Sequence, residues 1–155
     1  MLIDDGATLY AYAITRDFGF APNPFHGTCT LATCKPGIRK SAKIGDWVMG
    51  VGGSSLKNVK GKCICLMKIS EIMTFQDYWD DERFSIKKPS RNGSRTQMLG
   101  DNIYHKKDKV FIQEDSHHSN PDGSPNQENL RRDTRTTENI LISNCFFYFG
   151  DQAIP

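Results

Sequence analysis

The chain has 155 residues, of which 37% are hydrophobic and 25% are charged, and its formal net charge at pH 7 is +2. No apolar run approaches the roughly 20 residues that a membrane-spanning helix needs, and Asp4 and Asp5 interrupt the region where a signal peptide would be apolar. We therefore expect a cytoplasmic protein with one domain over residues 1–155, in which residues 1–8 are a loose lead-in.

The first half of the chain is organised around two predicted strands and the long segment between them. Apolar runs predict strands over residues 9–14 and 46–51. The intervening segment carries several phenylalanines, so we expect an ordered loop that lines a site; a surface loop pinned by its own rings is the alternative. Within it, residues 29–34 can form a strand or a turn, and residues 38–42 can form one helical turn.

The middle of the chain predicts a strand followed by a short helix. Residues 62–73 are apolar through their centre, and we expect one strand with a bend near Ser70. Thr74 is a predicted N-cap of a helix over residues 74–84, because Asp77 follows it three residues later as in a capping box.

The remaining elements are a hairpin and a final strand region, separated by polar segments. Residues 85–98 and 114–129 are predicted loops, and the hairpin arms are residues 102–105 and 110–113, with a turn at Lys107 and Asp108. Residues 130–138 match neither a helix pattern nor a strand pattern clearly, so we assign them no secondary structure. Residues 139–149 are predicted as one long strand or two short ones.

These elements predict an α+β fold. Five or six strands occur with one or two short helices, and strands and helices do not alternate regularly. We therefore expect a curved, mostly antiparallel sheet or a small open β-barrel.

The five cysteines favour free thiols over a disulfide framework or a zinc ribbon, because their number is odd and no CxxC pair occurs. Cys34 precedes Lys35, which can lower a thiol pKa, and Ser116 precedes His117. Adjacency in sequence does not make a catalytic arrangement, so we predict neither a cysteine nor a serine nucleophile.

Three of the four histidines occur close to aspartates in the second half of the chain. Asp101, His105, Asp115, His117 and His118 could form a divalent metal site or an acid/base pair. No known ligand spacing occurs, and adjacent histidines generally point in different directions. We therefore predict no metal site.

A nucleotide pocket needs aromatic faces, a few fixed polar groups and cations for phosphate. Two basic tracts, residues 29–62 and 85–110, could supply the cations if they meet on one face, although solvated lysines on ordinary loops explain them equally well. The candidate aromatic residues are Tyr12, Phe18, Phe20, Phe25, Trp47 and Tyr104.

The motif ITRDFGFAPNPFHGTCTLATCKPGIRKSAKIGDWVMG, followed by GDNIYH, DSHHS and LIS…FFYFG, resembles the nucleotide modification associated domain 2 family. That family is found among phages and bacteria near predicted DNA-base hypermodification genes. The resemblance implies a role linked to modified nucleotides or DNA bases, without an assigned reaction. The GDWV turn and strand, followed by a strand ending in ISE, also resemble the layout of PUA-like domains such as EVE and YTH, which hold modified bases.

The family-like positions are Thr15, Arg16, Asp17, Asn23, Pro24, Phe25, Cys29, Cys34, Lys35, Pro36, Arg39, Gly45, Asp46, Trp47, Gly100, Asp101, Asn102, Tyr104, His105, Ser116, His117 and His118.

Our leading hypothesis is a PUA-like or related domain that binds a nucleotide or modified base, free or within nucleic acid. Arg16, Lys35 and Arg39 would hold phosphate. Asp17, Asn23, Asp101 and Asn102 would contact base or sugar. The full set of predicted ligand-binding residues is Thr15, Arg16, Asp17, Asn23, Phe25, Lys35, Arg39, Trp47, Asp101, Asn102, Tyr104, Ser116 and His117.

Two alternatives stay open. The first is an enzyme acting on a nucleotide or DNA base, with Asp17, Asp101, His105, His117 or His118 as acid, base or metal ligand. The second is an accessory protein that contacts partner proteins of a base-modification pathway. The sequence identifies no cofactor, and we expect no membrane partner.

Overall fold

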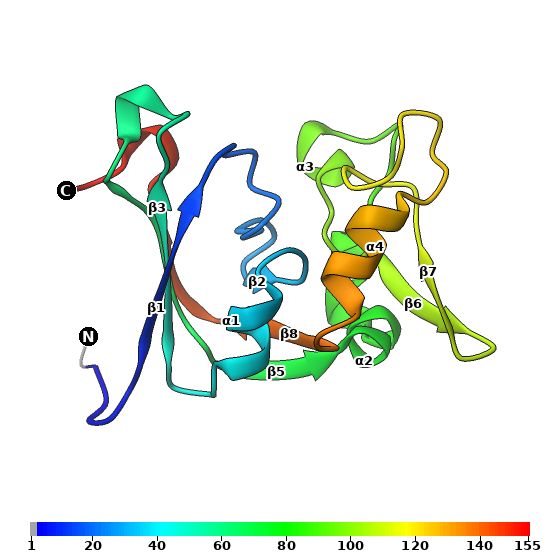
Figure 1. The fold of residues 1–155 in the computed structure, drawn as a ribbon, viewed down its shortest axis with the longest axis horizontal. Coiled ribbons are helices and arrows are strands. Elements are labelled where there is room, and N and C mark those ends of the chain that lie inside the picture. The colour runs from blue at the N-terminus through cyan, green and yellow to red at the C-terminus, as the bar shows by residue number, and fades with distance from the viewer. Residues whose placement is uncertain (1–2) are drawn as a thin grey trace.

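The structure, a computed structural model, describes residues 3–155 (Figure 1). Met1 and Leu2, the start of the expected lead-in, lie outside the described residues.

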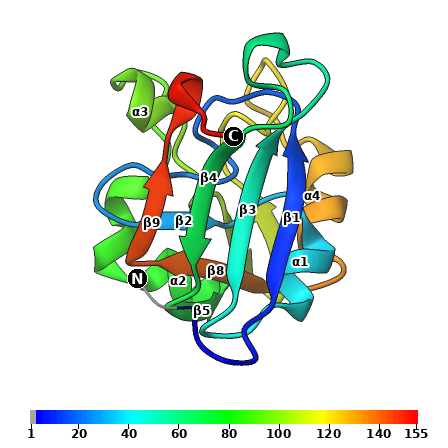
Figure 2. The ribbon, with the colours of Figure 1, turned by 90° about the vertical axis from the view of Figure 1, so that its left-hand side faces the viewer.

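A four-stranded sheet forms one side of the molecule and is seen face on in Figure 2. In spatial order its strands are β1 (Leu9–Ile14), β3 (Trp47–Gly52), β4 (Cys63–Lys68) and β9 (Cys145–Tyr148). β1 is parallel to β3, and the other neighbours are antiparallel. Burial alternates along β1 with the period of two that a half-buried strand requires, so Tyr10, Tyr12 and Ile14 face inward.

A three-stranded antiparallel sheet crosses behind the first (Figure 2). Its order is β2 (Cys29–Leu31), β8 (Asn139–Ser143) and β5 (Glu71–Thr74). A core of buried side chains from both sheets joins them, including Leu31, Val48, Met67 and Leu141.

Two sharp bends carry the chain from one sheet to the other. The predicted strand 62–73 divides at Ser70 into β4 and β5, and the predicted region 139–149 divides at Asn144 into β8 and β9. The backbone N–H of Asn144 donates to Ser70 Oγ at 3.0 Å, and Ser70 N donates to Ile142 O at 2.8 Å. These bonds fix the two bends to each other.

Helices and a hairpin gather at the end of the molecule opposite β1 and β3 (Figure 1). They are α2 (Phe75–Asp80), α3 (Arg95–Met98), β6 (Tyr104–Lys107), β7 (Val110–Gln113) and α4 (Gln127–Thr134), and α1 (Pro36–Ser41) lies between them and the four-stranded sheet. Short 3-10 turns are η1 (Lys57–Val59), η2 (Glu82–Lys87) and η3 (Gly150–Gln152). As predicted, Thr74 caps α2, since its side chain accepts the N–H of Asp77 at 3.1 Å.

The expected α+β class with mostly antiparallel sheets is confirmed, although residues 3–155 contain nine strands rather than five or six. The sheets in this part of the chain do not close into a barrel. The hairpin begins at Tyr104, and its turn falls on Asp108 and Lys109, which have φ values of 51° and 66°. Within residues 3–155, every helix falls short of the length and apolar character needed to span a bilayer.

The structure also contains helices where the hydrophobic pattern of the sequence is weak. α3 and part of η2 lie in the predicted loop 85–98. α4 covers the first half of residues 130–138, for which the sequence predicts no definite structure. α4 is short and mostly polar, so its hydrophobic periodicity is weak. Its start is defined by Asn126, whose side chain accepts the N–H of Asn129 at 3.0 Å.

Candidate active site

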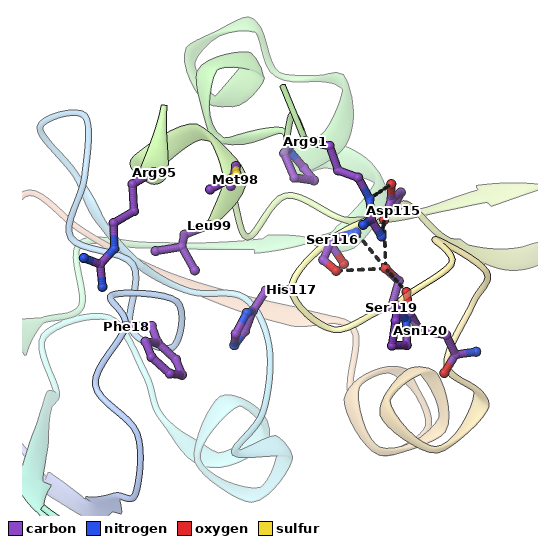
Figure 3. A pocket seen from close by; sticks show the side chains of 12 residues that line it. Phe18, Arg91, Arg95, Met98, Leu99, Asp115, Ser116, His117, Ser119 and Asn120 are labelled. Carbon is purple, nitrogen blue, oxygen red and sulfur yellow. Dashed lines mark hydrogen bonds and ion pairs between the residues drawn. The ribbon is translucent and has the colours of Figure 1, made fainter. Parts of the chain in front are cut away.

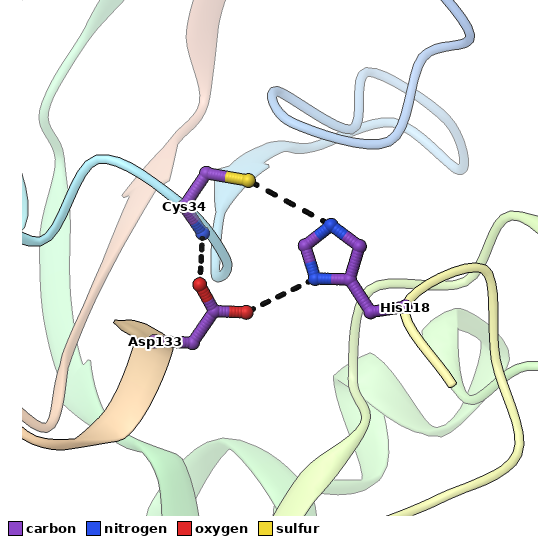
Figure 4. Close-up of side chains that lie close together, drawn as sticks. All are labelled: Cys34, His118 and Asp133. Carbon is purple, nitrogen blue, oxygen red and sulfur yellow. Dashed lines mark hydrogen bonds and ion pairs between the residues drawn. The ribbon is translucent and has the colours of Figure 1, made fainter. Parts of the chain in front are cut away.

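A cysteine, a histidine and an aspartate from distant parts of the chain meet in a triangle of mutual contacts (Figure 4). Cys34 lies between β2 and α1, His118 lies in the loop after β7, and Asp133 lies in the last turn of α4. Cys34 Sγ is 3.7 Å from His118 Nε2, and His118 Nδ1 is 3.0 Å from Asp133 Oδ2. The imidazole therefore contacts the thiol through one ring nitrogen and the carboxylate through the other, while Sγ and an oxygen of Asp133 also lie within 4.8 Å of each other.

The backbone at Cys34 adopts a conformation that is uncommon for residues other than glycine. Cys34 and Lys35 have φ values of 57° and 43°, after which Pro36 begins α1. The backbone N–H of Cys34 donates to Asp133 Oδ1 at 2.8 Å, and its carbonyl accepts from Arg39 Nε at 2.7 Å. Left-handed residues that the surroundings hold in place in this way cluster at functional sites.

Arg39 joins the segments that form the site by hydrogen bonds to their backbone carbonyls. Its side chain is fully buried, and besides Cys34 O it donates to Asn139 O at 2.9 Å and to Asp133 O at 2.6 Å. Burial lowers the pKa of Arg39 to about 10, partly offset by Asp133. Arg39 is thus cationic at neutral pH and joins the β2–α1 connection to α4 and β8.

The carboxylate of Asp133 accepts four hydrogen bonds, and the residue has no exposed surface. Oδ1 accepts from Cys34 N and, at 3.0 Å, from Arg132 Nε; Oδ2 accepts from His118 Nδ1 and, at 2.7 Å, from the Tyr104 hydroxyl. Burial raises the pKa of this carboxyl, but bonds from His118, Tyr104 and Arg132 lower it by more, to about 2. The ionised carboxylate therefore fixes the proton on His118 Nδ1 and leaves Nε2 facing the thiol.

The hairpin β6–β7 supports this carboxylate from behind. Burial and Asp133 raise the pKa of Tyr104, so its hydroxyl stays protonated and donates. Gln113 Nε2 donates to Tyr104 Oη at 3.0 Å, and Gln113 Oε1 accepts the N–H of Asn126 at 2.7 Å. The same glutamine thus contacts both the partner of Asp133 and the start of α4.

The surroundings favour the ionised thiol. Burial raises the pKa of Cys34, but the His118 imidazole and the Arg132 guanidinium, whose Nη2 is 3.6 Å from Sγ, lower it by more. Burial lowers the pKa of His118, but Asp133 and Cys34 raise it by more. Both shifts stabilise a thiolate and imidazolium pair, which is the reactive state of a catalytic cysteine.

These three residues also form the one cluster of metal-ligand type found in residues 3–155, with ligand atoms within 4.8 Å of one another. Cys34 and Asp133, however, pair with opposite nitrogens of a single imidazole. His118 Nδ1 donates its proton to Asp133, so only Nε2 has a lone pair for a metal ion, and both Asp133 oxygens already accept two hydrogen bonds each. A zinc site needs three or four protein ligands, so the geometry fits a nucleophile better than a metal ligand set.

Cys34 and His118 line a cavity of about 760 Å³. Its walls come from β1, residues 15–21, the β2–α1 connection, residues 117–118 and α4, and its cations are Arg16, Lys35 and Arg132. The Phe20 ring lies 4.5 Å from His118 and 5.0 Å from His117, measured between centroids. In residues 3–155, no acceptor pairs with the backbone N–H of Lys35, next to the thiol.

The family model for nucleotide modification associated domain 2 matches residues 6–155, nearly the whole chain. The chain belongs to this family. The resemblance found in the sequence is therefore confirmed, and the family's name indicates an association with nucleotide modification. No curated protein and no solved structure matches the chain.

Several residues that the sequence predicts for ligand binding in this family member do line the cavity. They are Thr15, Arg16, Lys35 and His117, together with His118 from the catalytic set. Tyr104 lies behind the cavity and binds Asp133, and Ser116 lines an adjoining hollow while its Oγ accepts the N–H of His118 at 3.3 Å. Their roles as ligand contacts stay predictions.

Other predicted residues lie in the protein interior and do not line the cavity at Cys34. Asn23, Trp47, Asp101 and Asn102 are buried, and Phe25 is half-buried against the core. Asp101 accepts from Thr30 and Tyr78, and Asn102 donates to Tyr78 O and Phe84 O. The buried ammonium of Lys87 donates to Asn23 O and Oδ1 and to Thr28 O. The bonds of Asn23, Asp101 and Lys87 join the long loop to the core, whereas Asn102 Oδ1 and Trp47 Nε1 are buried without a partner in residues 3–155.

Two predicted acid/base residues have partners outside the cysteine cluster. Asp17 accepts a hydrogen bond from the Tyr148 hydroxyl and lines a separate hollow near residues 55–59. His105 stacks on Trp79 at 4.2 Å and pairs with Glu114 at 2.7 Å. Conversely, the structure brings Cys34 and Asp133 to His118, although the sequence predicts no cysteine nucleophile and assigns no role to Asp133. The local signal is the Cys-Lys-Pro step, which lies between a strand and a helix and places Pro at the helix start.

Proposed function

We propose that this member of the nucleotide modification associated domain 2 family is a cysteine-dependent enzyme that cleaves or transfers an acyl group on a nucleotide or modified base. The observation that carries the proposal is that His118, in the wall of the cavity, contacts the Cys34 thiol through one ring nitrogen and the Asp133 carboxylate through the other. Cysteine, histidine and a carboxylate in this order of contact serve nucleophilic acyl transfer on several unrelated folds.

The groups present can carry both halves of such a reaction. The Cys34 thiolate attacks the carbonyl carbon, a thioester forms, and the leaving amine or alcohol takes the proton from His118 Nε2. Water or an acceptor nucleophile then gives its proton to His118 and attacks the thioester, which releases Cys34 as thiolate and restores the imidazolium. The N–H of Lys35, which follows the nucleophile in the chain and has no acceptor in residues 3–155, is the donor we assign to the oxyanion of each tetrahedral intermediate.

The substrate class rests on different support. The family is associated with nucleotide modification, and the cavity combines the exposed ring of Phe18 with the cations Arg16, Lys35 and Arg132. Aromatic faces and cations are the two groups that a nucleotide requires. A binding module without turnover uses the same cavity, and it is the second candidate.

An acyl-enzyme experiment tests the chemistry. Incubation with p-nitrophenyl acetate, followed by intact-mass and peptide analysis, should acetylate Cys34 in the wild-type protein. Acetylation should disappear in Cys34→Ala and persist in Cys63→Ala, a matched control, because Cys63 is also a half-buried free thiol. Equal acetylation of Cys63 and Cys34, or acetylation that persists in Cys34→Ala, would show that Cys34 is not the nucleophile.

The same assay tests the substrate class. Ordinary and modified nucleotides that occupy the cavity should slow acetylation of Cys34 in proportion to their occupancy. If nucleotides bind, as seen by thermal shift, while Cys34 does not acetylate, the binding module is correct. If Cys34 acetylates and no nucleotide protects it, the enzyme acts outside nucleotide chemistry.

A further inference from the structure

The cavity at Cys34 continues into a second hollow on each side. Toward α3 it shares Phe18 and His117 with a hollow of about 530 Å³ (Figure 3). Toward α4 it shares Pro36 and Arg132 with another of about 460 Å³. We call this succession of three hollows the Cys34 groove.

Arginines line the Cys34 groove along its whole length. Arg131, Arg132 and Arg135 lie at the α4 end, Arg16 and Lys35 in the centre, and Arg91 and Arg95 at the α3 end. The acidic lining residues are Glu128 and Asp115, and Asp115 is neutralised by its ion pair with Arg91. The groove therefore carries a clear excess of positive charge although the chain as a whole is nearly neutral.

Several of these cations form no hydrogen bond or ion pair with the described part of the chain. In residues 3–155, no acceptor pairs with the guanidinium groups of Arg95, Arg131 and Arg135, and all three side chains are exposed. Their donors are free for an anionic ligand. Arginine is the side chain best suited to phosphate, because its planar donors match two phosphate oxygens.

An aromatic platform lies between the two charged ends. The Phe18 side chain is 40% exposed and meets His117 edge to face at 5.2 Å between centroids. In Figure 3 both rings border the hollow across from Met98 and Leu99. An exposed phenylalanine inside a cationic groove is the arrangement on which single-stranded bases stack.

We propose that the Cys34 groove binds a single-stranded polynucleotide. Its phosphates pair with Arg131 and Arg135 on one side of Cys34 and with Arg95 on the other, while a base stacks at Phe18 and His117. A free nucleotide would occupy one charged end only, whereas unpaired arginines lie beyond the cavity in both directions. The inference rests on the proposed function, to which it adds that the modified base reaches Cys34 within a strand.

The test is fluorescence anisotropy with a labelled single-stranded DNA of about 12 nucleotides over a range of salt concentrations. The wild-type protein should bind with affinity that falls as salt rises. Arg131→Gln/Arg135→Gln and, separately, Arg95→Gln should weaken binding, the double variant by roughly tenfold or more at about 0.1 M salt. The salt slope should become shallower by about one for each phosphate that a variant no longer neutralises.

A matched control removes the same charge elsewhere. Lys107 and Lys109 are exposed in the β6–β7 hairpin, outside the groove, so Lys107→Gln/Lys109→Gln should bind as the wild type does. Equal weakening in the control and in the arginine double variant would overturn the proposal, as would undiminished binding in both groove variants. Tighter binding of duplex DNA, or full competition by an equal concentration of mononucleotide, would also overturn it.

Acetylation of Cys34 by p-nitrophenyl acetate, measured in the same variants, separates this inference from the proposed function. The rate should be unchanged in Arg131→Gln/Arg135→Gln and in Arg95→Gln. Acetylation without strand binding would remove the polynucleotide inference alone. Strand binding without acetylation would remove the acyl-transfer function and leave the groove as a nucleic-acid interface.

Discussion

His118 is the residue on which the site depends, because each of its ring nitrogens faces a different partner. The Asp133 carboxylate fixes the proton on Nδ1, and the thiol of Cys34 faces Nε2. Its neighbour His117 instead packs against Phe18, at the boundary of two hollows. Of two adjacent histidines, one therefore contacts the thiol and the carboxylate, and the other forms part of the cavity wall.

The thiol of Cys34 should react at lower pH than an ordinary thiol. Its pKa is lowered despite burial, so the thiolate forms at lower pH and the alkylation rate rises earlier in a pH titration. Replacing His118 with Ala removes the group that lowers the pKa most, so the midpoint should move to higher pH. Iodoacetamide labelling followed by peptide mass spectrometry measures both curves.

Cys63 provides an internal standard in the same digests. Burial and then the charge of Cys65 raise its pKa, so its labelling curve should lie at higher pH than that of Cys34 and should not change in His118→Ala. Coincident curves for the two cysteines would contradict the assignment of a paired thiolate.

Among the structural elements, the β2–α1 connection carries Cys34, and Arg39 keeps this connection in place. Arg39 binds backbone carbonyls of three segments that are separate in sequence. A buried cation that satisfies three carbonyls cannot be replaced without leaving some of them unpaired.

We expect Arg39→Lys to lower the free energy of unfolding by about 3 kcal/mol, because one ammonium group cannot reach three divergent carbonyl oxygens. Urea denaturation followed by circular dichroism measures the change. Lys40→Ala, at the exposed neighbouring position, should stay within about 0.5 kcal/mol of the wild type. A decrease for Arg39→Lys no larger than that of the control would show that Arg39 is not a structural clamp.

On the scale of the whole molecule, the Cys34 groove is formed by parts that belong to different layers. β1 and residues 15–21 form one wall, and the 115–121 loop and α4 form the other. A strand bound in the groove would therefore restrain both walls at once.

Hydrogen exchange should record that restraint. Saturation with the single-stranded DNA should slow amide exchange in residues 15–21, in residues 115–121 and in α4, because binding a ligand reduces local opening. The β6–β7 turn, which lies outside the groove, serves as the internal control and should exchange at its unbound rate. Protection centred on that turn would place the nucleic acid on another surface.

Sequence reasoning succeeds where structure is local and fails where it depends on distant pairing. The strand at residues 9–14 and the Thr74 cap have short-range patterns, and both occur as expected. The bends at Ser70 and Asn144 depend on a hydrogen bond between positions 74 residues apart. The contacts of Cys34 with His118 and Asp133 span 84 and 99 residues, so no local pattern contains them.

Charged and polar residues can be wrongly predicted as ligand contacts, because the sequence does not show which of them are buried. The sequence predicts that Arg39 binds phosphate and that Asn23, Asp101 and Asn102 contact a base or sugar. In the structure each of these side chains is buried and bonded within the protein. A polar residue in such a loop can instead form the buried hydrogen bonds that keep the loop ordered.

The end of α4 carries, within a few residues, both the carboxylate that contacts His118 and two arginines of the groove. Asp133 faces inward to His118, while Arg131 and Arg135, two positions away on either side, face solvent. An α-helix turns by about 100° per residue, so insertion of a single residue early in α4 would rotate the carboxylate out of the site and the arginines off the groove together. Insertions in this family should therefore be tolerated before Asn126 or after Arg135, and not between them.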